Sequence, residues 1–277
     1  MAEPAPRAAG VRAALGEAAA RFGFSETPRL DAELLMAHAL GIERAALLLD
    51  MDRGVPERFW TLVARRERHE PVAYITGSRG FWTLDLGVGP GALVPRADSE
   101  TLVEAAVTHF RGRAPATLLD LGTGPGTLLL ALLDEWRGAR GVGVDRSAEA
   151  LGYAVANAAA CGMGARAGFV LGDWDAALTG VFDCIVTNPP YIGTNERLPD
   201  EVRLHEPAGA LFAGPDGLDD YRRLAPAIRR LLAPGGAAFL EIGHRQGDAV
   251  TALLAAQGFA VTLHRDLAGR ARVLAAT

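Results

Sequence analysis

The residues of this sequence with the most distinctive chemistry are Asn188, Pro189, Pro190 and Tyr191, which follow an apolar run over residues 182–186. The two prolines cannot donate hydrogen bonds to a sheet, so a strand through that run must end here. Pro189 also holds Asn188 in an extended conformation. The tetrapeptide therefore presents a side-chain amide, a backbone carbonyl and an aromatic ring at the edge where open α/β sheets bind ligands. Taken alone, the stretch could equally be a proline-rich turn after a strand.

A glycine-rich stretch follows an earlier predicted strand and precedes a predicted helix. It consists of Asp120, Leu121, Gly122, Thr123, Gly124, Pro125 and Gly126. Glycine allows the backbone to turn sharply and to approach a ligand closely. The spacing differs from the dinucleotide-binding fingerprint, and the stretch has no Lys or Arg to neutralise a phosphate.

Acidic residues stand at the ends of the next two predicted strands. Asp145 is placed where a carboxylate can accept hydrogen bonds from both hydroxyls of a ribose. Asp173 could accept from an adenine amino group, with Trp174 covering the face of the ring. A ligand with a ribose, an adenine and an amino-acid tail suits these residues better than a dinucleotide, which predicts S-adenosylmethionine. The alternative is that Asp120 and Asp145 only cap helices.

The composition is that of an ordinary globular protein, with 277 residues, 49% of them hydrophobic and 22% charged. A net charge of −5 argues against the broad basic surface expected of a protein that binds duplex nucleic acid. No apolar run reaches the roughly 18 residues that span a membrane, and no signal peptide is expected. Cys161 and Cys184 lack ligand spacing, so we expect reduced thiols, a cytoplasmic protein and no metal site.

Three helices are predicted before residue 70, from the spacing of apolar residues over 11–22, 28–41 and 56–70. Gly41 is the predicted stop of the second helix. The third contains Arg65, Arg66 and Arg68, which could form a solvated face or a docking surface. We interpret residues 1–70 as a helical domain.

Residues 71–97 are predicted to form a β-hairpin linker, with strands over 81–88 and 92–94 joined by a turn at residues 89–91. A helix over 98–110 should follow, capped by Asp98 or Ser99.

Predicted strands then alternate with helices, at residues 117–121, 141–145, 168–171, 182–187, 237–242, 260–264 and 272–275. This alternation predicts an α/β domain over 98–277 with a Rossmann-like, doubly wound sheet of seven strands. The last two strands are joined by a loop, which predicts an antiparallel last strand.

Together these residues resemble the class I S-adenosylmethionine-dependent methyltransferases. The chain resembles in particular the protein-(glutamine-N5) methyltransferases that modify peptide-chain release factors, and the similarity covers nearly its whole length. The matching stretches are residues 31–35 with His38, 68–77 with Phe81 and Trp82, 206–211, 216–218 with Tyr221 and Arg222, 241–243 with Gln246, and 266–270. Two positions depart from the family pattern, Ala97 in place of a proline and Pro125 in place of the commoner serine.

The resemblance implies methyl transfer from S-adenosylmethionine to N5 of the glutamine in a release factor's Gly-Gly-Gln motif, with S-adenosylhomocysteine as product. The side-chain oxygen of Asn188 and the carbonyl of Pro189 would accept the two amide hydrogens, and Pro190 and Tyr191 would complete the substrate site. Such acceptors orient the nitrogen and stabilise its developing positive charge. The expected cofactor-binding residues are Asp120, Gly122, Thr123, Gly124, Pro125, Gly126, Asp145, Asp173, Trp174 and Asn188. The helical domain would recognise the substrate.

Three other functions remain open. A sibling enzyme could methylate a glutamine of a ribosomal protein. A nucleic-acid adenine-N6 methyltransferase would need a basic face and a flipped base. A non-catalytic scaffold is disfavoured because Asn188 and Asp145 are both present. His205 and His244 are expected to be structural. We expect a monomer whose partner is a release factor, with neither nucleic acid nor membrane bound directly.

Overall fold

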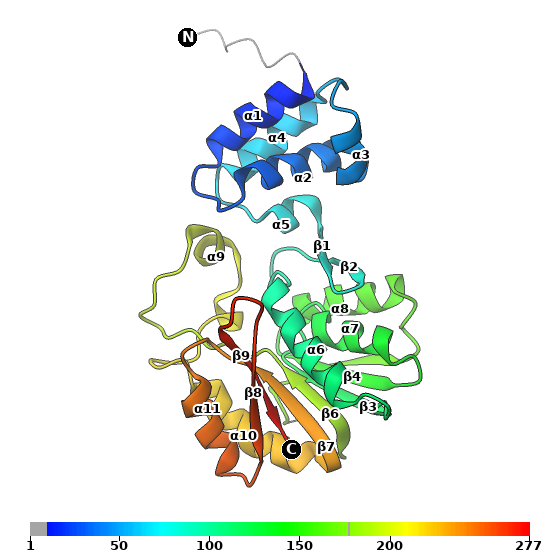
Figure 1. Ribbon diagram of the computed structural model, residues 1–277, viewed down its shortest axis with the longest axis vertical. Coiled ribbons are helices and arrows are strands. Elements are labelled where there is room, and N and C mark those ends of the chain that lie inside the picture. The colour runs from blue at the N-terminus through cyan, green and yellow to red at the C-terminus, as the bar shows by residue number, and fades with distance from the viewer. Residues whose placement is uncertain (1–9, 177) are drawn as a thin grey trace. The chain divides into compact units, whose positions relative to one another are not determined.

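The computed structural model describes residues 10–176 and 178–277, and most of its helices and strands are labelled in Figure 1. The chain forms two compact units. The helical unit comprises the described residues up to Gly77 together with Pro199–His205, and the sheet unit comprises Ser78–Leu198 and Glu206–Thr277. The three-part division at residues 70 and 97 stays a prediction.

The helical unit is built around one apolar core. Its helices are α1 (Val11–Arg21), α2 (Pro28–Leu40), α3 (Arg44–Leu49), α4 (Glu57–Arg66), α5 (Val72–Thr76) and α9 (Asp200–His205). The three helices predicted from periodicity are α1, α2 and α4, and Gly41 ends α2 in the left-handed conformation with φ of 69°. Helices α3 and α5 are not predicted from the sequence, because five or six residues are too few to show a helical period.

Arg66 does not belong to a solvated face or a docking surface. Its side chain is 3% exposed and lies 2.8 Å from a carboxylate oxygen of Asp31 and 2.8 Å from one of Glu201. Two carboxylates offset the desolvation of one buried guanidinium. Arg65 is likewise occupied by an ion pair, with Glu70. Arg66 therefore stabilises the helical unit from within, whereas Arg65 is partly exposed and Arg68 is exposed.

The hairpin of the sheet unit is shorter than predicted and turns earlier. Strands β1 (Ser78–Phe81) and β2 (Leu84–Gly87) are antiparallel. The predicted strands over 81–88 and 92–94, with a turn at 89–91, are therefore wrong.

The position of this turn is explained by Trp82, which adopts a φ of 55°. Its backbone N–H donates to Glu100 at 2.9 Å, and its indole N–H donates to Glu135 at 2.7 Å. Two carboxylates from later helices thus stabilise a backbone conformation that a tryptophan rarely adopts.

The helix after the hairpin begins differently from the prediction. A 3-10 turn over Ala97–Ser99 leads into α6 (Glu100–His109). Neither predicted cap forms a capping hydrogen bond at this helix start. Asp98 instead lies 2.9 Å from the guanidinium of Arg272. Because Ser99 caps no helix N–H group, its hydroxyl is available for another partner.

Seven strands form one mixed sheet in the order β5-β4-β3-β6-β7-β9-β8. Their bounds are β3 (Thr117–Leu121), β4 (Arg140–Asp145), β5 (Ala167–Leu171), β6 (Phe182–Thr187), β7 (Leu232–Glu241), β8 (Val261–Arg265) and β9 (Ala271–Ala276). The last strand, β9, is antiparallel to both of its neighbours. The predicted fold class is confirmed, and β7 begins five residues earlier than predicted.

Helices pack on both faces of this sheet (Figure 1). One apolar core contains residues of α6, α7 (Thr127–Glu135) and α8 (Ala148–Ala160), and the other contains residues of α10 (Asp219–Leu231) and α11 (Gly247–Ala255). The parallel strands β3, β4, β5 and β6 therefore end together at one edge, which brings together the segments that follow them. No helix of the described chain is long and apolar enough to cross a membrane.

Candidate active site

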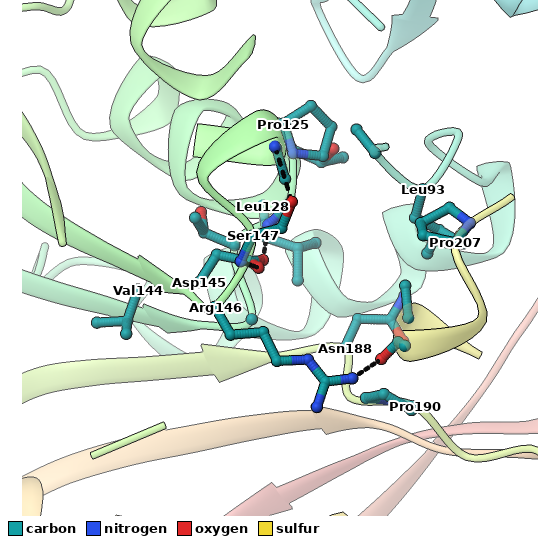
Figure 2. Close-up of a pocket in the computed structure, with 18 of the residues that line it drawn as sticks. Leu93, Pro125, Leu128, Val144, Asp145, Arg146, Ser147, Asn188, Pro190 and Pro207 are labelled. Atoms are coloured by element: carbon teal, nitrogen blue, oxygen red, sulfur yellow. Dashed lines mark hydrogen bonds between the residues drawn. The ribbon is translucent and has the colours of Figure 1, made fainter. Parts of the chain in front are cut away.

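A cavity lies at the carboxyl ends of the parallel strands (Figure 2). Predicted site residues that line it are Gly122, Thr123, Gly124, Pro125, Asp145, Asp173, Trp174, Asn188 and Pro190. Residues that the sequence analysis did not single out also line it, among them Leu93, Arg96, Ser99, Arg146, Pro207 and Gly209. Among the described residues, Asp120, Gly126, Pro189 and Tyr191 lie outside this lining. Most of the predicted cofactor residues, together with the predicted acceptor residue Asn188, thus border one space.

The glycine loop, residues 122–126, follows β3 and precedes α7. Gly122, Gly124 and Gly126 have φ values of 76°, 56° and 85°. Only glycine adopts this left-handed region without strain. A Cβ atom at Gly122 would also lie 3.0 Å from a ring carbon of Trp174. Glycine at this position therefore lets the loop and the tryptophan ring meet at the cavity wall.

Asp145, the last residue of β4, shapes the glycine loop. One carboxylate oxygen accepts from the backbone N–H of Gly124 at 2.8 Å, and the other accepts from that of Ser147 at 2.9 Å (Figure 2). Each carboxylate oxygen has a further lone pair available. Asp145 can therefore fix the loop and still accept hydrogen bonds from a ligand.

Asp120 lies beneath the loop, with 1% of its surface exposed. Its Oδ2 accepts from the Thr123 hydroxyl at 2.7 Å and from the backbone N–H of Leu129 at 3.2 Å, while Oδ1 has no partner in the described chain. Burial raises the pKa of this carboxyl to about 7. These contacts make Asp120 a support of the loop, and its direct contact with a cofactor stays a prediction.

Asp173 and Trp174 border the cavity beyond β5. The carboxylate of Asp173 pairs with Arg223 at 2.6 Å, and the indole N–H of Trp174 donates to Asp220 at 3.1 Å. Trp174 is thereby held in a backbone conformation with φ of 51°, with its ring beside Gly122. The fixed ring provides a flat surface on which a planar group can stack.

Asn157, a buried residue of α8, connects the glycine loop to the hairpin. Its side-chain amide donates to the carbonyl of Pro125 at 2.9 Å and to that of Gly87 at 3.0 Å, and it accepts from the N–H of Gly87 at 2.7 Å. This role of Asn157 is not predicted from the sequence. The only signal available was an asparagine inside an alanine-rich helix.

The acceptor turn, Asn188–Tyr191, begins directly after β6. The side-chain amide nitrogen of Asn188 donates to the hydroxyl of Ser99 at 3.2 Å. The backbone carbonyl of Tyr191 accepts from the side-chain amide of Gln246 at 2.9 Å. Burial raises the pKa of the Tyr191 hydroxyl to about 12, so it stays protonated. Partners from distant parts of the chain thus hold both ends of the turn.

Two arginines fasten the segment over residues 206–210 to the cavity wall. Arg96 forms an ion pair with the buried carboxylate of Glu206. Arg146 donates to the carbonyl of Gly209 at 2.5 Å (Figure 2). The lone histidines considered above are elsewhere: His205 contacts the carbonyl of Arg68 in the helical unit, and His244 is exposed.

Family models match most of the chain. The model described as PrmC N-terminal domain matches residues 13–77, and the model described as Methyltransferase small domain matches residues 97–202.

Several curated proteins are similar over nearly the whole chain. A release factor glutamine methyltransferase of Rhodospirillum rubrum is 46% identical over 258 residues, which cover 91% of this chain and 79% of that protein. A release factor glutamine methyltransferase of Caulobacter vibrioides is 43% identical, and the alignment covers 90% of this chain and 89% of that protein. One of Mycolicibacterium smegmatis is 38% identical and covers 91% of both.

Solved structures of other proteins share the fold over most of this chain at low sequence identity. A methyltransferase from Pyrococcus furiosus is 17% identical with a TM-score of 0.54, covering 77% of this chain and 95% of that one. A Thermus thermophilus 16S rRNA N2 G1207 methyltransferase in complex with AdoMet and guanosine is 24% identical with a TM-score of 0.50, covering 72% and 49%. Both likenesses concern the fold alone.

Proposed function

This chain belongs to the release factor glutamine methyltransferase family, and from that premise we propose that it methylates the side-chain amide nitrogen of a glutamine in a peptide-chain release factor. The observation that carries the proposal is the position of Asn188. Its amide borders the same cavity as the glycine loop and Asp145, so an acceptor nitrogen and a methyl donor can meet there.

We propose S-adenosylmethionine as the methyl donor, and the residues of the cavity suit its parts. The carboxylate of Asp145 can accept from the hydroxyls of a ribose, and the ring of Trp174 can stack on an adenine. The glycine loop has no cationic side chain, which suits an amino-acid tail better than a phosphate. When bound, the cofactor supplies a methyl group activated by a sulfonium.

The chemical task of the acceptor turn is to present an amide nitrogen, which is a weak nucleophile because its lone pair is delocalised into the carbonyl. We propose that the side-chain oxygen of Asn188 accepts one amide hydrogen and the backbone carbonyl of Pro189 accepts the other. These acceptors orient the nitrogen towards the donor and stabilise the positive charge that develops on it. Pro190 and Tyr191 would complete the surface around the planar amide.

We further propose that the helical unit recognises the release factor. A glutamine side chain alone offers too little area to select one protein among many, so specificity needs additional surface. The net charge of −5 gives no reason to assign that surface to nucleic acid. We also propose that the protein acts on the release factor as a monomer in the cytoplasm.

The proposal is tested by methyl transfer from radiolabelled S-adenosylmethionine to four purified acceptors. These are an unmethylated release factor, the same factor with its Gly-Gly-Gln glutamine changed to alanine, a set of ribosomal proteins, and DNA. Label should enter only the first acceptor, and mass spectrometry should place one methyl group on the glutamine. Transfer to the alanine variant, or preferential labelling of ribosomal protein or DNA, would contradict the proposed substrate.

A further inference from the structure

Behind the acceptor turn lies a buried carboxyl group, that of Glu241 at the end of β7, which is 1% exposed. The hydroxyl of Ser99 and the side-chain amide of Asn188 both lie beside it and lower its pKa as hydrogen-bond donors. Its Oε2 atom has no hydrogen-bond partner among the described residues. Glu241, Ser99 and Asn188 therefore form a closed group of three side chains.

The hydrogen bond between Asn188 and Ser99 sets the orientation of the Asn188 amide. The amide nitrogen of Asn188 donates to the hydroxyl of Ser99 at 3.2 Å. The carboxyl of Glu241 interacts with the same side-chain amide, whose donor group lowers the pKa of Glu241. Both neighbours thus bind the NH₂ end of the Asn188 amide, and its carbonyl oxygen is the end left for another partner.

We propose that Glu241 and Ser99 are positioning residues, which fix the Asn188 amide so that its Oδ1 is presented to the hydrogen of the substrate amide. The inference rests on the proposed function, in which that oxygen accepts from the glutamine. Without these two residues the amide could rotate by half a turn. It would then offer two hydrogens to a substrate that also offers hydrogens, and the substrate would be repelled from the reactive geometry.

The arrangement works in either protonation state of Glu241. Burial raises the pKa of this carboxyl to about 7, against the opposing influence of Ser99, Arg272 and Asn188, and Asp98 raises it further. The amide nitrogen of Asn188 donates to the hydroxyl of Ser99 whether or not Glu241 carries a proton. The direction of the hydrogen bonds at Asn188 is therefore the same in both states.

The test compares variants of the full-length protein by steady-state kinetics on an intact release factor. Glu241→Leu, which removes the acceptor, should lower kcat by about 10- to 100-fold, the scale expected when a reacting group is misplaced. The KM for the release factor and the Kd for S-adenosylmethionine should stay within about threefold, because substrate and cofactor contacts remain. Glu241→Gln retains a carbonyl oxygen at this position and should keep kcat within about fivefold of the wild type.

Tyr221→Phe is the matched control, since the Tyr221 hydroxyl donates to the backbone carbonyl of Glu241 at 2.7 Å. This variant should lose thermal stability and keep kcat within about threefold. An equal loss of kcat in Tyr221→Phe and Glu241→Leu would overturn the inference, because general loosening of the core would then explain both.

Coupling to Asn188 gives the sharpest readout. In an Asn188→Ala background, Glu241→Leu should lower kcat by no more than about twofold, because residues that act through one another are not additive. If Glu241→Leu does not fold, Ser99→Ala decides, with an expected loss of about fivefold. Full kcat in the folded variants would overturn the positioning role. An inactive wild type would instead contradict the proposed function itself.

Discussion

The glycine loop and the acceptor turn lie at the same edge of one sheet, yet they are held in different ways. In the glycine loop, the carboxylate of Asp145 and the amide of Asn157 bind backbone groups. In the acceptor turn, Ser99 and Glu241 bind a side chain, that of Asn188. In the glycine loop these contacts therefore fix the backbone conformation, and in the acceptor turn they fix the orientation of one side-chain amide.

Each end also rests on one buried acid. Asp120 lies beneath the glycine loop and Glu241 behind the acceptor turn, and burial raises the pKa of each to about 7. Each has one oxygen without a partner among the described residues. The comparison suggests that substitutions at the loop should chiefly change cofactor binding and stability, and that substitutions at the turn should chiefly change the rate of transfer.

The largest effect is expected at Asn188. Asn188→Ala removes an acceptor worth about 3 kcal/mol or more in the transition state, and should lower kcat by at least about a hundredfold. The affinity for S-adenosylmethionine, measured by calorimetry, should change by less than about threefold. Asn195→Ala, on the exposed loop that follows, is the matched control and should remain active. An Asn188→Ala variant with more than about a tenth of the wild-type rate would refute the assigned role.

A smaller effect is expected at Asp145, and it concerns cofactor binding instead of the rate of methyl transfer. Asp145→Ala should weaken S-adenosylmethionine binding by about 1–3 kcal/mol, the scale of hydrogen bonds to a charged group. At saturating cofactor, kcat should fall much less.

The control for Asp145 is Asp183→Ala. Asp183 accepts from the backbone N–H groups of Ala116 and Thr117 at 2.9 and 3.0 Å, at the opposite end of the strands. The Asp183→Ala variant should be less stable than the wild type but should bind S-adenosylmethionine with unchanged affinity. Equal affinity losses in both variants would mean that Asp145 acts only through the fold.

The third prediction concerns the dependence of stability on pH. The pKa of Asp120 is raised from 3.8 to about 7, so the folded protein keeps a proton that the unfolded chain releases near pH 4. The stability contributed by that proton is complete below pH 4 and is lost as pH rises towards 7. The loss amounts to at most about 1.4 kcal/mol per pH unit.

Asp120→Asn should flatten this slope, because the amide does not titrate. Urea unfolding between pH 5 and pH 8 measures it, and Glu241 contributes a slope of the same sign in both proteins. Parallel pH profiles for the wild type and the variant would show that Asp120 is ionised in the folded state throughout this range.

The smallest effect is expected from restoring the family residue at position 125. Pro125→Ser returns one backbone N–H to the glycine loop, and should tighten S-adenosylmethionine binding by about 1 kcal/mol or less. The carbonyl at this position can still accept from Asn157, so stability should hardly change. A large change in kcat at saturating cofactor would contradict the division between the two ends of the site.

The two ends also differ in how far the sequence predicts them. The glycine loop and Asp145 are recognisable because the residues that shape them follow consecutive strands at fixed spacing. The partners of Asn188 are not, because Ser99 lies 89 residues away in the chain and resembles a helix cap. Only the tertiary fold shows that its hydroxyl serves another purpose.

Two errors of the sequence analysis have the same origin. Trp82 was placed inside a strand, but carboxylates from later helices stabilise a turn there. Arg66 was placed on a surface, but Asp31 and Glu201 enclose it. In both cases a carboxylate far away in the sequence determines the conformation or burial of the residue. The periodicity of apolar residues does not predict such a contact.

The split of the helical unit has a consequence for its synthesis on the ribosome. Domains generally fold in the order in which they emerge, beginning with the amino-terminal one. This unit cannot be completed in that order, because Pro199–His205 belongs to it and is translated only after β3 to β6. Until Glu201 emerges, Arg66 lacks one of its two carboxylates. We therefore expect the nascent helical unit to stay less stable than the finished one until most of the sheet has been made.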